Sequence, residues 1–345
     1  MSDKKNRAVQ PAYGESEDIS LARDEQLDLF AILDPYSRPQ DVFSNSIELY
    51  DSLPKYVWEG REIKSVEKAT LTRECTIRGK RIIVKIKPAV IERGDKSILI
   101  YPGEREELVE DALRKIAVNG QIISVNGKAG VSFTLYELRK ELKRTGHTFS
   151  LDEIKEALFV CRGAVLECYS EDGSSVINSS YFGLMGLTTE EEFKTGKRTK
   201  CFVQFNPLVN DSIMNLTFRK YNYKVAMGIR SPLARFMYKR MAQYWSQASP
   251  ENPYTPNVVS FLHQSPRGLS SSMYENLRAM RNAIKVLANQ NVVLEEYEEE
   301  KVLEGKQKIR DVRFKIFPHP DFIRDVISAN QEKNSLRLKQ VRKNL

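Results

Sequence analysis

The stretch Leu269–Gln290, LSSSMYENLRAMRNAIKVLANQ, decides how the rest of the chain is interpreted. One set of its side chains recurs at steps of three and four, the period of an apolar helical face: Met273, Leu277, Met280, Ile284 and Leu287. A second stripe lies about 100° round the same helix and is polar and basic: Ser271, Tyr274, Arg278, Arg281 and Lys285. This pattern suits a helix that docks on a core and lies in a DNA groove. An ordinary surface helix with a solvated face would show the same pattern.

Charge is distributed unevenly along the 345 residues, whose net charge is +8. Residues 1–214 hold 31 Lys and Arg against 34 Asp and Glu, a net of −3. Residues 215–345 hold 23 against 12, a net of +11. Clustered positive charge is what the neutralisation of phosphates requires. The asymmetry therefore favours nucleic-acid binding through the second half of the chain, which contains Leu269–Gln290.

Several classes of protein are disfavoured by what the sequence lacks. No run approaches the about 18 apolar residues of a membrane span, and no apolar segment of a secretion signal follows the N-terminus. The four cysteines are scattered without a CxxC pair, which argues against structural zinc and disulfides. No P-loop, GxSxG or metal-binding histidine pattern occurs, and Gly127–Gly130 is interpreted as a turn before a strand. We expect a cytoplasmic protein that is not an enzyme and has no metal or cofactor; a nickase or recombinase is the alternative.

The first 205 residues divide into a tail and a predicted domain. Residues 1–45 are polar and are expected to be a disordered tail. Within residues 60–205, Thr70–Ile86 predicts a β-hairpin with a glycine turn. Helices are predicted over 104–118, 134–145 and 150–162, followed by strand-like runs on both sides of Glu171–Gly173. Three helices followed by a hairpin with a charged tip is the order of a winged helix.

Residues 206–328 follow much the same order. Ser231-Pro232 is a helix N-cap with proline at the first helical position. A short element at 258–263, the helix from Leu269, and strands at 292–297 and 309–317 complete the plan. The sequence therefore predicts an α+β fold with two winged-helix domains in tandem after the tail. The first would serve dimerisation and DNA binding, the second would be the main DNA reader, and residues 329–345 would form a basic tail.

A pentapeptide in the tail suggests a partner. Gln26-Leu27-Asp28-Leu29-Phe30 matches the Gln-Leu-Ser/Asp-Leu-Phe pattern by which many bacterial proteins bind the DNA polymerase sliding clamp. Leu29 and Phe30 would fill an apolar pocket, Leu27 would contact its edge, and Gln26 would form a hydrogen bond beside it. The alternative is a piece of helix that packs on the neighbouring domain.

The combination of these features, over about residues 25–300, resembles the TrfA-type plasmid replication initiators of the wider Rep family. The resemblance also rests on Ser231–Arg235 with the apolar-aromatic helix after it, on Ala283–Val293 and on Phe133–Leu138. It implies binding to repeated origin sites (iterons) in double-stranded DNA, opening of an A·T-rich segment with contact to its single strand, and plasmid copy control. It also implies recruitment of the clamp, the host initiator and the helicase, and a homodimer in equilibrium with the monomer. A winged-helix transcriptional repressor is the alternative, and it would have no use for Gln26–Phe30.

The candidate DNA contacts follow from this assignment. In the reading helix, Arg278, Arg281 and Lys285 would contact bases or phosphates, and the groove-facing start would present Ser271, Ser272, Tyr274 and Asn276. Further phosphate contacts are expected at Arg219, Lys220, Lys224, Arg235 and Lys239, and first-domain contacts at His147, Thr148, Ser150 and Lys155. The second wing carries the acidic run Glu295–Glu300, which would repel phosphates. Cations on the opposite strand could neutralise it by pairing across the hairpin, and these are further DNA-contact candidates: Lys306, Lys308 and Arg310.

Overall fold

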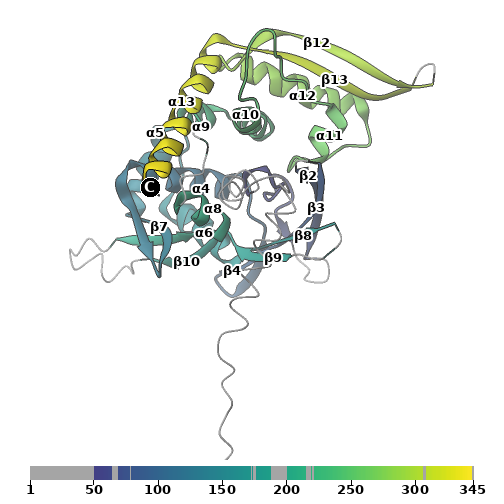
Figure 1. The fold of residues 1–345 in the computed structure, drawn as a ribbon. Coiled ribbons are helices and arrows are strands. Elements are labelled where there is room, and N and C mark those ends of the chain that lie inside the picture. Colours follow the sequence, from purple (N-terminus) through teal and green to yellow (C-terminus); the bar gives the residue numbers. More distant parts are fainter. Residues whose placement is uncertain are drawn as a thin grey trace, which may run out of the picture.

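The computed structural model describes residues 50–63, 69–77, 79–171, 173, 176–187, 200–214, 219, 221–305 and 308–343. These residues form two units, one above the other in Figure 1, each with its own apolar core. The first core is built mainly from residues 50–209 and the second from residues 226–326. The α+β class predicted from the sequence is confirmed.

The first unit contains antiparallel sheets of order β2-β3-β8-β9, β10-β11-β7-β6 and β1-β5-β4, with helices between them. In chain order its elements are β1 (Glu62–Ile63), β2 (Leu71–Ile77), β3 (Lys80–Lys87), β4 (Ala89–Arg93), β5 (Lys96–Ile100), α4 (Glu104–Ile116), a π-helical turn (Ala117–Gln121), β6 (Ile122–Val125), β7 (Lys128–Phe133), α5 (Leu135–Arg144), α6 (Leu151–Gly163), β8 (Val165–Ser170), β9 (Val176–Ser180), β10 (Phe182–Gly186), β11 (Cys201–Phe205) and α8 (Pro207–Met214). Because α8 places Leu208 and Val209 in the first core, this unit extends beyond the expected boundary at residue 205.

The predicted hairpin over Thr70–Ile86 is present as β2 and β3, and Ile77 pairs with Lys80 next to the turn. The glycine-rich segment 127–130 has the expected turn before a strand: Asn126 and Gly127 join β6 to β7, and residues 128–130 already lie in β7. Asn126 and Gly127 have φ values of 51° and 74°, the left-handed conformations of a two-residue hairpin turn. Gly130 lies in β7, where a Cβ atom would be 2.5 Å from the carbonyl oxygen of Val203 in β11.

Within the described residues, the first domain does not have the separate wing that the sequence predicts. β8 and β9 do form an antiparallel hairpin, with Val165 opposite Ser180. However, β8 also pairs along its length with β3, from Ile82 opposite Ser170 to Lys87 opposite Val165. The hairpin is therefore part of a four-stranded sheet, because the earlier hairpin supplies hydrogen bonds to its open edge.

The second unit has the winged-helix order predicted from the sequence. It contains α9 (Tyr223–Gly228), α10 (Pro232–Tyr244), α11 (Val258–His263), α12 (Met273–Ala288), β12 (Val293–Glu304), β13 (Lys308–Pro318) and α13 (Pro320–Lys343). Four of the five predicted apolar residues of α12 are buried in its core: Leu277, Met280, Ile284 and Leu287. Tyr254 and Asn257 bridge to β13 as short strand pairings. The expected C-terminal tail is helical as far as Lys343.

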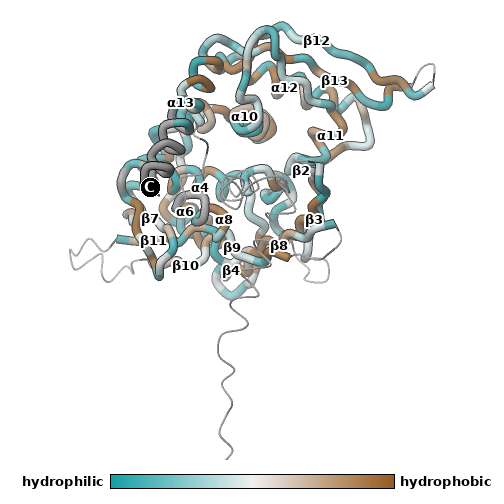
Figure 2. Tube along the Cα trace, viewed as in Figure 1, coloured by the Kyte–Doolittle hydropathy of each residue, from teal (hydrophilic) through white to brown (hydrophobic). Residues whose placement is uncertain are grey.

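The ribbon of β12 and β13 extends away from the helices of the second unit (Figure 1). Much of β12 is coloured as hydrophilic in Figure 2, in agreement with its mostly exposed side chains. Its base is anchored in the core by Val293, Phe314 and Ile316, which are at most 1% exposed. The ribbon is thus a wing whose base is fixed against the helices.

Candidate nucleic-acid interface

The start of α12 is fixed by two side chains. The Ser272 hydroxyl caps the helix and accepts a hydrogen bond from the backbone N–H of Glu275 at 3.4 Å. Asn276 is only 2% exposed, and its amide bonds to both the N–H (2.9 Å) and the carbonyl (2.8 Å) of Ser270. The expectation that Asn276 faces a groove is therefore corrected: it is buried because it holds the segment that enters α12.

The polar stripe predicted from the sequence is the exposed face of α12. Ser271, Tyr274, Arg278, Arg281 and Lys285 are all exposed, with Tyr274 at 71%. Among the described residues, neither Arg278 nor Lys285 has an ion-pair partner within 4.0 Å. Two cations on this face are thus available to an anionic ligand.

Arg281 is held by the wing. Its Nε and Nη2 atoms each lie 2.7 Å from one oxygen of Glu299 in β12, and the two side chains are 43% and 20% exposed. Hydrogen bonding to Glu299 raises the pKa of Arg281, so its charge is secure. A guanidinium has five N–H donors, and this pair uses only two of them. The outer Nη1–Nη2 edge of Arg281 is left with hydrogens for another acceptor.

The acidic run of β12 is partly neutralised by two cations of β13. Lys315 lies 3.1 Å from Glu298, and Arg313 lies 3.6 Å from Glu300. The register explains these pairs, since Glu298 is opposite Lys315 and Glu300 is opposite Arg313. Of the three expected cations, Arg310 is exposed, Lys308 stands opposite Glu304, and Lys306 lies outside the described residues.

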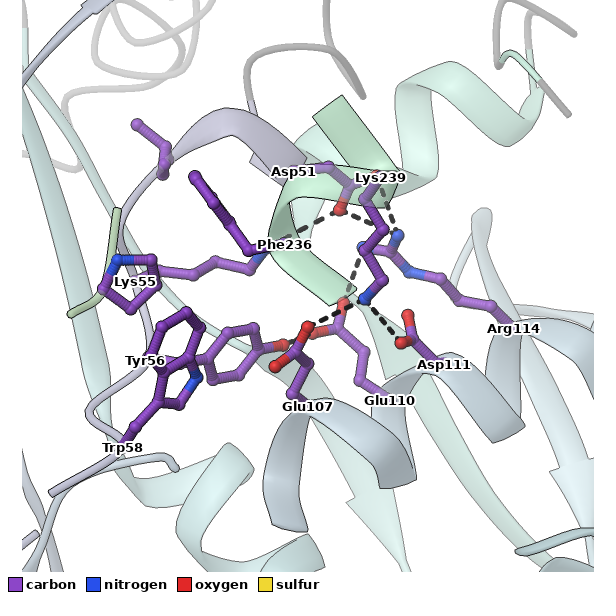
Figure 3. Close-up of a pocket in the computed structure, with 12 residues that line it drawn as sticks. Asp51, Lys55, Tyr56, Trp58, Glu107, Glu110, Asp111, Arg114, Phe236 and Lys239 are labelled. Carbon is purple, nitrogen blue, oxygen red and sulfur yellow. Dashed lines mark hydrogen bonds and ion pairs between the residues drawn. The ribbon is translucent and has the colours of Figure 1, made fainter. Parts of the chain in front are cut away.

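Arg235 and Lys239 were expected to contact phosphates, and the structure places them elsewhere. Both side chains reach from α10 to carboxylates of α4. Lys239 lies between Glu107 and Asp111 at 2.9 and 2.5 Å (Figure 3). Arg235 is fully buried and reaches Glu104 at 3.0 Å and Glu107 at 3.5 Å. These two cations hold the first and second units together because their counter-charges come from the other unit.

The protonation of this junction follows from its burial and its charges. Burial alone would raise the pKa of Glu107, but Lys239 and Arg235 lower it to about 2. Burial raises the pKa of Asp111 despite Lys239, and the neighbouring charge of Glu107 adds to the rise. Glu107 is the carboxylate that Lys239 and Arg235 share, so it is the one most firmly held in its charged form.

The remaining second-unit candidates are divided between structural and exposed positions. Arg219 donates from Nε to the carbonyl of Ala242 at 2.6 Å and from Nη1 to Asn330 at 2.8 Å. It therefore joins the end of α10 to α13 and has fewer donors left for phosphate. Lys224 is exposed on α9, and Lys220 lies outside the described residues.

The first-unit candidates do not form a basic face. His147 is 6% exposed, its Nε2 lies 2.8 Å from the carbonyl oxygen of Met227, and burial lowers its pKa. Ser150 caps α6, where it accepts a bond from the N–H of Glu153 at 3.1 Å. Thr148 is exposed, and Lys155 lies 3.6 Å from Asp152. The exposed side of α6 also presents Phe159, so it differs in chemistry from the exposed face of α12.

Some features lie beyond this surface. The expected tail and the clamp-binding candidate Gln26–Phe30 fall outside the described residues. All four cysteines are buried. Among the residues described, no group of His, Cys, Asp or Glu is placed to hold a metal ion. None of the helices in those same ranges is long and apolar enough to cross a membrane.

Comparison with solved structures finds the same fold elsewhere. The crystal structure of domains 2 and 3 of RctB matches with a TM-score of 0.50 and 10% identity, covering 80% of this chain and 98% of that chain. A second structure of RctB domains 2–3 gives a TM-score of 0.47 at 11% identity, covering 81% and 99%. The Pi initiator protein in complex with iteron DNA gives 0.41 at 8% identity, covering 63% and 95%. No protein-family model and no curated protein sequence matches the chain.

Proposed function

We propose that this chain is a sequence-specific DNA-binding protein that initiates plasmid replication at repeated origin sites. The observation that carries the proposal is the exposed face of α12, where Arg278, Arg281 and Lys285 project from a helix held in a winged-helix unit. The likeness to RctB domains 2 and 3 supports the fold of the two units. The net charge of +11 in residues 215–345 supports a polyanionic partner.

The geometry suggests how such binding would occur. An α-helix fits the major groove of B-form DNA and presents one face to the base edges. The free edge of Arg281 matches the O6 and N7 acceptors of guanine, while Arg278 and Lys285 neutralise phosphates on either side. The β12–β13 wing would lie along the adjacent backbone, with Lys315 and Arg313 limiting the repulsion from its carboxylates. No catalytic step, metal or cofactor enters this proposal.

Footprinting on DNA that flanks the gene tests the central claim. We expect protection of direct repeats by the wild-type chain and its loss in Arg278→Ala/Lys285→Ala. The matched control is Lys96→Ala/Lys128→Ala, which removes two exposed cations from the first unit and should retain the footprint. Absence of any protected repeat with the wild-type chain would refute the proposal.

The replication role depends on host partners, and Gln26–Phe30 is the proposed clamp-binding segment. Sliding clamp should be retained by the wild-type chain and lost with Leu29→Ala/Phe30→Ala, while both proteins keep the footprint. If neither protein retains clamp while both bind the repeats, a transcriptional repressor becomes the better interpretation. The proposed homodimer, in equilibrium with the monomer that starts replication, is tested by sedimentation over a range of concentrations.

The absence of catalysis is also proposed and can be tested directly. Supercoiled DNA carrying the protected repeats is incubated with the chain and Mg²⁺. We expect the DNA to stay supercoiled and free of covalently attached protein. A nick or a covalent adduct would favour the nickase or recombinase alternative.

A further inference from the structure

Helix α5 of the first unit begins in the same way as the proposed reading helix. Thr134 caps α5 as Ser272 caps α12, and each hydroxyl accepts a bond from a backbone N–H three residues on. In both helices a tyrosine is the second residue after the cap. Tyr136 and Tyr274 are 70% and 71% exposed, the two most exposed large apolar or aromatic side chains in the part of the chain that the structure describes.

Cations follow this tyrosine on the exposed side of α5. Leu138 and Leu142 are fully buried and fix the orientation of the helix, so the opposite side presents Arg139, Lys140 and Lys143 to solvent. None of these three has an ion-pair partner within 4.0 Å among the described residues, whereas the adjacent Arg144 is paired with Glu141 at 2.6 Å. The three cations thus share one helix face without a counter-charge from the described residues.

This arrangement works against the stability of the isolated helix. Arg139 and Lys143 are four residues apart, and Lys140 and Lys143 are three apart. Like charges at these spacings destabilise a helix. The helix dipole compensates Lys143 in the last turn but not Arg139 and Lys140 in the middle of the helix. A polyanion bound along this face would remove the repulsion.

The basic surface continues into the second unit. Gly146, just after α5, has φ +87°, and a Cβ atom there would be 2.9 Å from Nη2 of Arg230. Arg230 is exposed on the segment between α9 and α10, beyond the residues of the first core. The bond between His147 and the carbonyl of Met227 holds the two segments together. We call Tyr136, Arg139, Lys140, Lys143 and Arg230 the α5 face.

We infer that the α5 face is a second DNA-binding site, which holds the phosphodiester backbone outside the stretch read by α12. Its side chains are donors suited to phosphate oxygens, and such contacts position a protein without reading sequence. The Tyr136 ring also offers a surface on which an unpaired base could stack. This inference rests on the proposed function, and it places the DNA contact of the first unit on α5 and not on α6.

The test is the salt dependence of DNA binding by the full chain with Arg139→Ala/Lys140→Ala/Lys143→Ala. Each neutralised phosphate contributes about 0.9 to the slope of log affinity against log salt. On a long duplex carrying a protected repeat, the slope should therefore fall by about 2–3. The control Lys80→Ala/Lys96→Ala/Lys128→Ala removes the same charge from β3, β5 and β7 and should keep the wild-type slope. An unchanged slope in the α5 variant on both this duplex and single-stranded DNA, or an equal fall in the control, overturns the inference.

The length and strandedness of the DNA identify which backbone is held. If the α5 face binds flanking duplex, its variant should match the wild type on a short duplex limited to the α12 site and be weaker on the long one. If it binds a displaced strand, the loss should appear on single-stranded DNA, and Tyr136→Ala should add to it. Equal binding by variant and wild type on both DNAs contradicts the inference.

The variant Arg278→Ala/Lys285→Ala separates the two proposals. If it loses the footprint while the α5 variant keeps its slope, only the α5 inference fails. If it keeps the footprint while the α5 variant loses slope, the assignment of α12 fails and the α5 face stands. Thermal unfolding should show the α5 variant at least as stable as the wild type, because repulsion has been removed.

Discussion

Arg281 and Glu299 form a bidentate pair between α12 and the base of the wing, with both N–O distances at 2.7 Å. The pair fixes the plane of the guanidinium, because two parallel hydrogen bonds allow little rotation. It leaves the Nη1–Nη2 edge of Arg281 with hydrogens that can meet the O6 and N7 atoms of a guanine. Glu299 would therefore orient the residue that is proposed to read a base.

Glu299→Gln should have opposite effects on general and specific DNA binding. Affinity for scrambled duplex should rise, because one negative charge near the phosphates is removed. The ratio of specific to scrambled affinity should fall about threefold to tenfold, because a weaker hydrogen bond of about 1 kcal/mol replaces a charged one. Titration of both duplexes measures this ratio. The control Glu300→Gln removes the same charge from an exposed site and should keep the ratio. An equal rise for both duplexes with Glu299→Gln would show that Glu299 only competes with DNA.

Arg281→Ala should weaken binding to the protected repeat by about 1–3 kcal/mol, the usual value for a bidentate base contact. The loss should be confined to one base pair, so that the variant no longer distinguishes guanine from other bases there. Titrations on duplexes changed one position at a time measure it. Unchanged affinity on the protected sites would remove Arg281 from the reading residues.

Asn276→Ala should destabilise the second unit by about 1–3 kcal/mol, because the N–H and carbonyl of Ser270 lose their partner. The matched control is Asn282→Ala on the same helix, whose side chain is exposed and which should change stability by less than about 0.5 kcal/mol. Urea unfolding compares the two variants. Equal stability of the variants would mean that the Asn276 amide does not hold the start of α12.

The comparison of sequence and structure shows which inferences local patterns can support. The two faces of α12 were predictable, since a 3.6-residue period specifies its own buried side at Leu277, Met280 and Ile284. The burial of Asn276 was not predictable, because its hydrogen-bond partners belong to the turn before the helix. The sequence predicts a phosphate contact for Arg235, whereas its side chain pairs with Glu104 and Glu107. These partners could not be foreseen because they lie about 130 residues earlier, in the other unit.

Three other differences have related causes. The first-domain wing was misplaced because β3, which pairs with β8, comes from the hairpin at the start of the unit. The pattern of the ribbon alone does not predict that Glu299 pairs with Arg281, because Arg281 lies on α12. The α5 face does not follow from the winged-helix order, in which α6 occupies the position of a reading helix. The sheet that contains β8 and the Arg281–Glu299 pair both depend on contacts between separate segments, which a local sequence pattern does not show.

The junction between α4 and α10 gives a pH-dependent prediction. The pKa of Glu107 is lowered from 4.5 to about 2, so its contribution to stability is present above pH 4.5 and is lost as the pH falls toward 2. Glu107→Gln should therefore cost about 3 kcal/mol at pH 7, the usual price of breaking a buried ion pair. The difference between variant and wild type should shrink between pH 4.5 and pH 2.

Urea unfolding of wild type and Glu107→Gln at several pH values between 2 and 7 measures this difference. The opposite shift of Asp111 also contributes to the pH dependence, and Glu107→Gln should reduce it because the charge of Glu107 is one of its causes. The difference between the two proteins therefore reports the charge of Glu107 together with its effect on Asp111. Glu92→Gln, at an exposed position of β4, is the control and should follow the wild type throughout. A cost for Glu107→Gln that stays constant from pH 7 to pH 2 would show that the shape of the side chain matters there and its charge does not. A cost that disappears at low pH would establish that the charges on Lys239 and Arg235 hold the two units together through Glu107.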